Sequence, residues 1–148
     1  MKKNKIKDTG LEITELSFGT SSLGSMPDTY GYEVPEDRAQ KTLNRFFQGP
    51  VNMLDTSRNY AMGESEKRIG KAIKENGGWP KDFLLSTKLD RNMDTLVLDK
   101  NRARESLEES LKTLNVDSVD ILFLHDPEYA KDVNDITKKS GAMDELFK

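Results

Sequence analysis

Residues 51–88 read VNMLDTSRNYAMGESEKRIGKAIKENGGWPKDFLLSTK, and they contain two short apolar runs separated by a longer segment of mixed polarity. The runs Val51–Leu54 and Phe83–Thr87 have the length and composition of strands. Between them, Glu64–Asn76 places apolar residues at intervals of three and four, which indicates a helix with one buried face. Gly77-Gly78 ends that helix. The stretch therefore predicts a strand–helix–strand unit with parallel strands.

The same alternation extends in both directions along the chain. Upstream, the strand candidate Leu16–Thr20 is followed by a helical pattern over Pro35–Gln48. Downstream, the helical pattern of Asp99–Asn115 leads into the strand candidate Val119–Leu124. Each strand and the helix after it have the size of one β/α unit. We therefore predict four consecutive β/α units, with residues 1–148 forming one domain and no second domain.

Three segments lie outside these regular patterns. Ile6–Ile13 is divided by the turn signal Asp8-Thr9-Gly10 and predicts a short N-terminal β-hairpin, of a size to close the bottom of a barrel. Ser21–Val34 is predicted to be a loop. A last helix is expected from near Ser140. The side chains expected on one face of that helix are Met143, Leu146 and Phe147.

Composition argues against several classes of function. The 148 residues include 23 basic and 26 acidic side chains, and a net charge of −3 gives no positive field for nucleic acid. No apolar run approaches the roughly 20 residues that span a bilayer, so no membrane partner is expected. With no cysteine and a single histidine, we expect no metal site. Because disulfides are excluded, a cytoplasmic location is the expectation.

Four β/α units fit either a small doubly wound sheet or part of a (β/α)8 TIM-type barrel. A doubly wound nucleotide fold requires a glycine-rich phosphate loop after its first strand, and Gly19-Thr20-Ser21-Ser22-Leu23-Gly24 matches no such motif. A barrel instead predicts reactive side chains at the C-terminal ends of several strands. Asp55, Lys88 and His125 follow three successive strands in this way. We therefore predict a half barrel of about four units.

Each of these side chains also has an ordinary structural explanation. Asp55 suits a turn or a helix cap, Lys88 a salt bridge, and His125 a hydrogen-bonded position at the edge of the core. Their coincidence points the other way, because neighbouring parallel strands lie about 4.8 Å apart and bring the three groups to one pocket. Tyr60 follows Asp55 by five positions and is close enough to fold over the same pocket. We predict a site that contains all four side chains.

The residues around this predicted site resemble the aldo-keto reductase family. Asp55-Thr56-Ser57-Arg58-Asn59-Tyr60, continued by Gly63-Glu64-Ser65-Glu66 and Gly70, is similar to the second-strand signature of that family. Ser86-Thr87-Lys88 resembles its lysine motif, and the segment that ends in Leu124-His125 resembles its histidine strand. The run through His125-Asp126-Pro127-Glu128 resembles the aldose and pyridoxal dehydrogenase branch in particular.

The resemblance implies hydride transfer between NADP or NAD and a small-molecule aldehyde, ketone or sugar hemiacetal. It implies that Tyr60 is the acid in reduction and the base in oxidation, with Lys88 favouring the phenolate and Asp55 orienting Lys88. His125 would donate a hydrogen bond to the substrate oxygen. Gly19, Thr20 and Asp55 are the positions where the family contacts the cofactor near its nicotinamide.

A whole barrel takes about 250 residues, so the four units are about half of one. The main phosphate anchors of such barrels follow strands seven and eight, and we expect these 148 residues alone to turn over weakly or not at all. The first and fourth strands are expected to be open edges that favour self-association. Two other interpretations stay open: a lyase that forms a Schiff base on Lys88, and a non-catalytic half barrel for binding or assembly.

Overall fold

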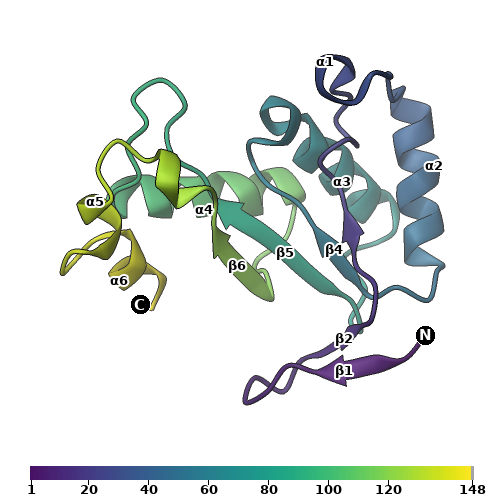
Figure 1. The fold of residues 1–148 in the computed structure, drawn as a ribbon. Helices are drawn as coiled ribbons and strands as arrows, with labels where there is room; N and C mark the ends of the chain where they lie inside the picture. Colours follow the sequence, from purple (N-terminus) through teal and green to yellow (C-terminus); the bar gives the residue numbers. More distant parts are fainter. Residues whose placement is uncertain (148) are drawn as a thin grey trace.

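A four-stranded parallel sheet forms the centre of the computed structural model, which describes residues 1–147 (Figure 1). The strands lie side by side in the order of the sequence, as the β/α alternation predicts. Their bounds are β3 (Phe18–Gly19), β4 (Met53–Asp55), β5 (Leu84–Leu89) and β6 (Ile121–Leu124). The register pairs Gly19 with Asp55, and Asp55 with Ser86. The ends of neighbouring strands are thereby brought to one edge of the sheet.

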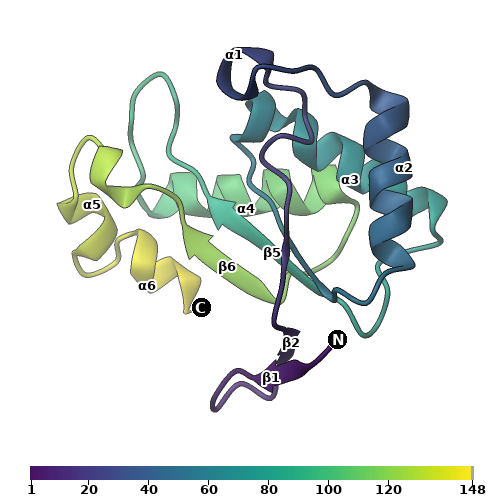
Figure 2. The same cartoon turned by 45° about the vertical axis from the view of Figure 1, so that its right-hand side comes forward.

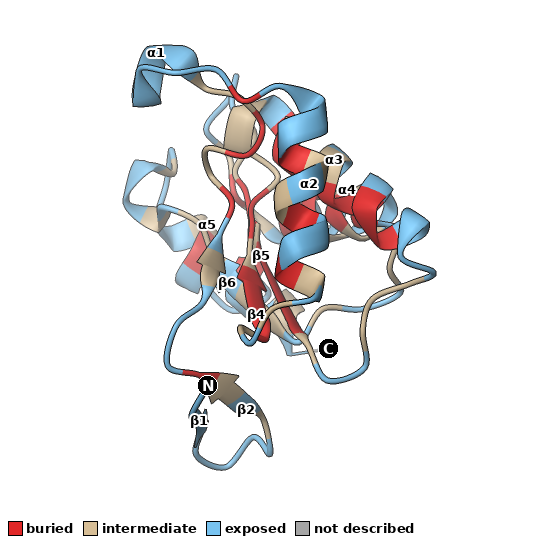
Figure 3. Ribbon diagram, turned by 90° about the vertical axis from the view of Figure 1, so that its right-hand side faces the viewer, coloured by how far each residue is buried: buried red, intermediate tan, exposed pale blue. Residues whose placement is uncertain are grey.

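Three long helices cover one side of this sheet (Figures 1 and 3). They are α2 (Glu36–Phe47), α3 (Glu64–Glu75) and α4 (Lys100–Leu114), each within one or two residues of its predicted bounds. The Asp99 side chain caps α4 by accepting bonds from two backbone N–H groups of the first turn. The faces of α2 and α3 that the periodicity predicts to be buried are the faces packed against the strands.

The buried face of α4 differs from the predicted leucine stripe. Ala103 and Leu114 are buried as expected, but Ser106 and Ser110 are the other fully buried side chains, while Leu107 and Leu111 are only half-buried. The predicted stripe is therefore rotated toward the serines. Small side chains suit this face because α4 packs closely on α3 and on β5.

The predicted N-terminal hairpin is present and lies below the N-terminal ends of the parallel strands (Figures 1 and 2). Strand β1 (Lys3–Lys5) pairs antiparallel with β2 (Glu12–Thr14), so the first strand precedes the predicted range and the second overlaps its end. Asn52, which precedes β4, attaches the hairpin to the sheet. Its Oδ1 accepts a 2.9 Å bond from the Thr14 N–H, and its Nδ2 donates to the Glu12 carbonyl.

Two expectations outside the β/α units were incomplete. The predicted loop over Ser21–Val34 contains a one-turn helix, α1 (Pro27–Tyr30), which begins with proline and ends at Gly31 in the left-handed conformation. The last helix, α6 (Ala142–Leu146), is confirmed, but its predicted apolar face is wrong. Leu146 packs against the core, whereas Phe147 is 84% exposed and Met143 is 40% exposed. Ala142 takes the buried position instead.

Three short helical turns lie in the connections that follow the strands. Two of them directly follow the strands that carry the predicted site residues. These turns are η1 (Tyr60–Gly63), η2 (Pro127–Tyr129) and α5 (Asn134–Thr137). Among the helices of residues 1–147, none has the length and apolar character needed to cross a membrane.

An aromatic cluster lies at the C-terminal end of α2, beside the N-terminal ends of the strands. Trp79 and Phe83 pack against Phe46 and Phe47 of α2, with ring centroids 5.2–6.4 Å apart. The Trp79 Nε1–H donates a 3.0 Å hydrogen bond to the Phe83 carbonyl, so the indole is held at both its apolar and its polar edge. This cluster lies at the end of the sheet opposite to the predicted site and fastens α2 to the turn before β5.

Candidate active site

An open hollow of about 500 Å³ lies at the inner face and C-terminal ends of the strands. Three of the predicted site residues, Asp55, Lys88 and His125, line it. The other lining residues are Ser17, Gly19, Met53, Phe123, Leu124 and Asp126. Asp55 and Lys88 are 33 positions apart in the sequence, and Lys88 and His125 are 37 apart. The ends of the strands therefore bring together ionisable groups that are distant along the chain.

Asp55 and Lys88 form a close ion pair within this hollow. Lys88 Nζ lies 2.7 Å from Asp55 Oδ2 and also donates a 2.7 Å bond to the Thr56 carbonyl. Asp55 Oδ1 accepts a 2.8 Å bond from Ser86 Oγ, which belongs to the same face of β5 as Lys88. Both ends of the carboxylate are thus occupied. The lysine side chain is 13% exposed, so the pair is partly shielded from water.

Tyr60 packs between Lys88 and His125. Lys88 Nζ lies 4.7 Å from the centroid of the Tyr60 ring, which is cation–π geometry, and the His125 ring meets the same ring edge-on at 5.6 Å. Lys88 therefore contacts the face of the ring, and its action on the phenol hydroxyl stays a prediction. The next two residues, Ala61 and Met62, both have positive φ, at 51° and 53°. Such strained backbone is common where a side chain must be aimed into a site.

His125 is held from behind by a buried carboxylate, Asp90. The ring atom Nδ1 contacts Asp90 Oδ1 and lies 3.0 Å from Ser57 Oγ. Asp90 is 0% exposed, and its Oδ2 accepts a 2.8 Å bond from Ser57 Oγ. Neither partner entered the predicted site. The available signal was the position of Asp90 directly after β5, two residues beyond Lys88.

Two of the three residues predicted to contact a cofactor, Gly19 and Thr20, occupy different environments. Gly19 is exposed and lines the hollow, and a methyl group added to it would meet no atom within 4 Å. Thr20 is 1% exposed, and its hydroxyl donates a 2.9 Å bond to the Asp55 carbonyl. The Thr20 carbonyl in turn accepts a bond from Ser65 Oγ at the start of α3. Thr20 therefore ties β3 to β4 and α3, and a direct cofactor contact of its hydroxyl stays a prediction.

A second buried carboxyl group, Glu66 of α3, lies on the opposite face of β5. Glu66 Oε1 accepts a 2.8 Å bond from Thr87 Oγ1. Burial raises the pKa of Glu66, and this effect exceeds the lowering by the hydrogen bonds of Thr87 and Ser110 and by the nearby Arg58 charge. Because Thr87 is on the face of the strand opposite to Lys88, Glu66 supports the site from the helical layer and does not enter the hollow.

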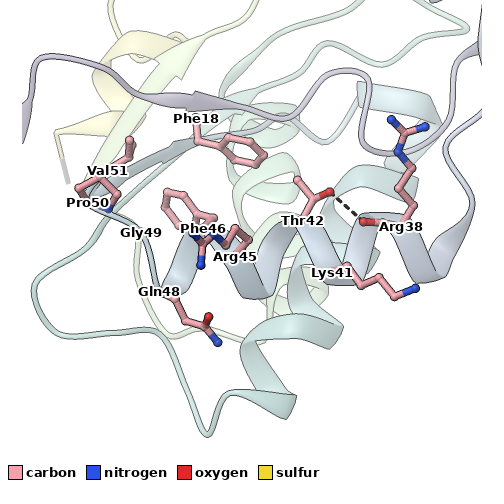
Figure 4. A pocket seen from close by; sticks show the side chains of 10 residues that line it. All are labelled: Phe18, Arg38, Lys41, Thr42, Arg45, Phe46, Gln48, Gly49, Pro50 and Val51. Atoms are coloured by element: carbon pink, nitrogen blue, oxygen red, sulfur yellow. Dashed lines mark hydrogen bonds between the residues drawn. The ribbon is translucent and has the colours of Figure 1, made fainter.

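A larger hollow, of about 550 Å³, lies elsewhere, between β3 and α2 (Figure 4). Figure 4 shows Phe18, Phe46 and Val51 along its apolar wall, with the basic side chains of α2 at its rim. Among residues 1–147, no acidic side chain lines it. The larger hollow therefore offers no acid–base pair. The candidate active site is the smaller hollow at the strand ends. Within residues 1–147, no three carboxylate or imidazole groups are placed to hold a metal ion.

Comparisons with known proteins identify the family of this chain. The sequence profile of the aldo/keto reductase family matches residues 15–148. L-galactose dehydrogenase of Arabidopsis thaliana is 38% identical over 82% of this chain, and the aldo-keto reductase YhdN of Bacillus subtilis is 34% identical over 86% of it. The chain covers 37% and 39% of those two proteins, so it spans about two-fifths of their length.

The fold comparison gives the same result. The holo form of an aldo-keto reductase from Bacillus halodurans superposes with a TM-score of 0.67 and 28% identity, over 88% of this chain and 43% of that one. The four parallel β/α units and the N-terminal hairpin are therefore part of a TIM-type barrel architecture. On the evidence of the family profile, the ordered strand-end residues and this fold, the chain belongs to the aldo/keto reductase family.

Proposed function

We propose that this chain supplies the proton-transfer groups of a nicotinamide-dependent oxidoreductase that acts on an aldehyde, a ketone or a sugar hemiacetal. The observation that carries the proposal is the packing of Tyr60 between Lys88 and His125, with Lys88 paired to Asp55. The dehydrogenase and reductase names of the relatives support it. Because the chain spans about two-fifths of those relatives, the activity is proposed for the completed barrel.

The proposed cofactor is NADP or NAD, which supplies the hydride when it is bound. The described residues fit such a group. The hollow is open at Gly19, where the backbone leaves room for close approach, and it presents the Asp55 carboxylate and the Lys88 amine as polar partners. We propose that Gly19 and Asp55 form the part of the cofactor site that this chain contributes, with Thr20 holding their two strands in register.

Proton transfer follows from the charges in the hollow. We assign the Tyr60 hydroxyl as the group that gives a proton to the substrate oxygen in reduction and takes one in oxidation. The Lys88 charge over the ring stabilises negative charge on the phenol when the proton has left, and Asp55 holds Lys88 in that position. His125 would donate a hydrogen bond to the same substrate oxygen and stabilise the developing alkoxide.

The Schiff-base alternative is disfavoured by the surroundings of Lys88. A lysine nucleophile must lose its proton before it attacks a carbonyl group. Here Nζ donates hydrogen bonds at 2.7 Å to two acceptors, the Asp55 carboxylate and the Thr56 carbonyl, so it presents no free lone pair toward a carbonyl carbon. The non-catalytic alternative is disfavoured by the side-chain set itself, since an assembly module does not require an ion pair, a phenol and an imidazole packed against one another.

Replacement of Tyr60 by phenylalanine tests the proposed function. In the completed barrel that carries this chain, Tyr60→Phe should lower kcat/KM for carbonyl reduction by at least about 10²-fold, because the proton donor is lost while the ring packing is kept. The measurement is the carbonyl-dependent absorbance change of the reduced nicotinamide, with several aldehydes and aldoses. Tyr32→Phe is the matched control, since Tyr32 is 49% exposed and packs on Tyr30.

Two results would overturn the proposal. One is carbonyl-dependent cofactor oxidation that survives Tyr60→Phe at the rate of the Tyr32→Phe control. The other is covalent trapping of a carbonyl substrate on Lys88 by borohydride, which would establish the lyase alternative.

A further inference from the structure

We propose that Asp90 is a positioning residue for His125. In this assignment Asp90 keeps a proton on Nδ1 of the imidazole and so leaves Nε2 as the nitrogen that meets a substrate oxygen. The inference rests on the proposed function for what His125 does to a substrate. The protonation of Nδ1 by itself does not depend on any substrate or cofactor.

The contacts around Nδ1 come only from acceptors. Asp90 Oδ1 contacts Nδ1 directly, and Ser57 Oγ lies 3.0 Å from it. Ser57 has one hydroxyl proton, and it donates that proton to Asp90 Oδ2 at 2.8 Å. Ser57 Oγ can therefore only accept from the ring. An ionised carboxylate also only accepts, so Nδ1 must carry a hydrogen.

Asp90 is held in place as an acceptor by further hydrogen bonds. Its Oδ2 accepts from Ser57 Oγ and from the backbone N–H of Asn59 at 3.2 Å. Its backbone is held from α4 at both polar groups. The Asp90 N–H donates to Ser106 Oγ at 2.9 Å, and the Asp90 carbonyl accepts from Arg102 Nε at 3.0 Å. The carboxylate therefore has one defined position behind the ring.

The other charged groups around His125 do not compete for Nδ1. Asp126 lies on the opposite side of the ring, with Oδ2 at 3.9 Å from Nε2, and it is about half exposed. Lys88 is paired with Asp55, and Tyr60 meets the imidazole edge-on. The buried carboxylate is therefore the partner that sets the tautomer, while Nε2 lies on the side of Asp126, which also lines the hollow.

This arrangement specifies how His125 can act. With Nδ1–H held by Asp90, a ring with one proton presents a lone pair at Nε2 and can only accept there. A ring with two protons donates from Nε2, and the Asp90 carboxylate balances its charge. The hydrogen bond to a developing alkoxide therefore requires the doubly protonated ring, with Asp90 as its counter-ion.

The test uses the fact that His125 is the single histidine of the chain, so its ring nitrogens give unambiguous 15N resonances. In two-bond 1H–15N spectra of the unmodified chain without cofactor, Nδ1 should resonate as a protonated nitrogen. Asp90→Asn should reverse this above neutral pH. The Asn59 N–H still needs an acceptor, so the new carboxamide oxygen takes the place of Oδ2 and its NH2 group faces Nδ1. Nδ1 then becomes the acceptor, and the proton moves to Nε2.

Asp126→Asn is the matched control, because it makes the same chemical change beside the other ring nitrogen. It should leave Nδ1 protonated. Ser57→Ala should also leave Nδ1 protonated, since Asp90 remains, and it supplies a second variant if Asp90→Asn does not give a folded amide spectrum. An unprotonated Nδ1 in the unmodified chain would overturn the proposal. So would a shift of the Nδ1 resonance that is the same in Asp90→Asn and Asp126→Asn. A failure of the Tyr60 activity test would leave these spectra unchanged, so the two hypotheses fail separately.

Discussion

Glu66 shows how a single buried group couples the stability of this chain to pH. Its side chain is fully buried, and burial raises its pKa above the ordinary 4.5. The folded state then binds the proton more tightly than the unfolded chain does. Its contribution to stability is fully present below pH 4.5 and is lost as the pH rises through the higher folded pKa.

Glu66→Gln should therefore make the chain more stable at neutral pH. The amide keeps an acceptor for Thr87 Oγ1 and removes a buried charge, so we expect a gain of about 1 kcal/mol in the free energy of unfolding at pH 7–8. The gain should shrink to nothing below pH 4.5. Urea unfolding of both chains from pH 4 to pH 8 measures it.

The control for this prediction is Glu109→Gln, which should have the opposite sign. A hydrogen bond from Arg102 lowers the pKa of Glu109, so its charged form stabilises the fold above the ordinary pKa, and that contribution is lost as the pH falls through the lower folded value. If Glu66→Gln lost stability at neutral pH, as Glu109→Gln is expected to do, the account of Glu66 as a penalised charge would be wrong.

At the scale of elements, the contact between α3 and α4 depends on one glycine. A methyl group added to Gly70 would lie 2.0 Å from the Thr113 carbonyl oxygen, which is backbone and cannot rotate away. Glycine in a helix interior is otherwise unfavourable by about 0.5–1 kcal/mol relative to alanine. The close approach of α3 and α4 therefore explains why glycine stands at position 70, whereas helix propensity does not.

Gly70→Ala should destabilise the chain by about 2 kcal/mol, because the helices must separate and the gain in helix propensity offsets only part of the cost. The free energy of unfolding in urea is the measurement. Gly19→Ala is the control, with no atom within 4 Å of the added methyl group, and should change stability by less than about 0.5 kcal/mol. Equal effects of the two substitutions would refute the steric argument.

For the molecule as a whole, the feature that governs association is the outer edge of the parallel sheet, formed by β6. Strand β6 pairs with β5 on one side, and no other described strand pairs with it. Phe123 of this strand is 48% exposed beside the candidate active site. An exposed apolar edge strand is a site for pairing with another chain. We expect residues 1–148, expressed alone, to self-associate through this edge.

Phe123→Lys should reduce that association, because a charge on an edge strand opposes strand pairing. Size-exclusion chromatography with light scattering gives the mass at several protein concentrations. Phe147→Lys is the control, since Phe147 is 84% exposed but follows a helix. The prediction is wrong if the unmodified chain stays monomeric at high concentration. It is also wrong if both substitutions reduce the association equally.

The sequence could predict whatever depends on periodicity and on local signals. The β/α rhythm predicted the four parallel strands in order and the three long helices, because strand and helix periods are local properties of the chain. The hairpin followed from a turn motif. The strand-end rule then placed Asp55, Lys88 and His125 at one rim, since parallel strands end on the same edge.

Side-chain partners could not be read in the same way. The bond from Lys88 to Asp55 joins residues 33 positions apart, and the contact of His125 with Ser57 joins residues 68 apart. Such pairs depend on strand register and on the exact packing of α4. The buried side of α4 is rotated toward Ser106 and Ser110 relative to the stripe that the sequence pattern predicts. The contact between Asp90 and His125 is an example. Asp90 is held in its buried position by Ser57, Ser106 and His125, which come from three separate segments, and no local sequence pattern encodes that position.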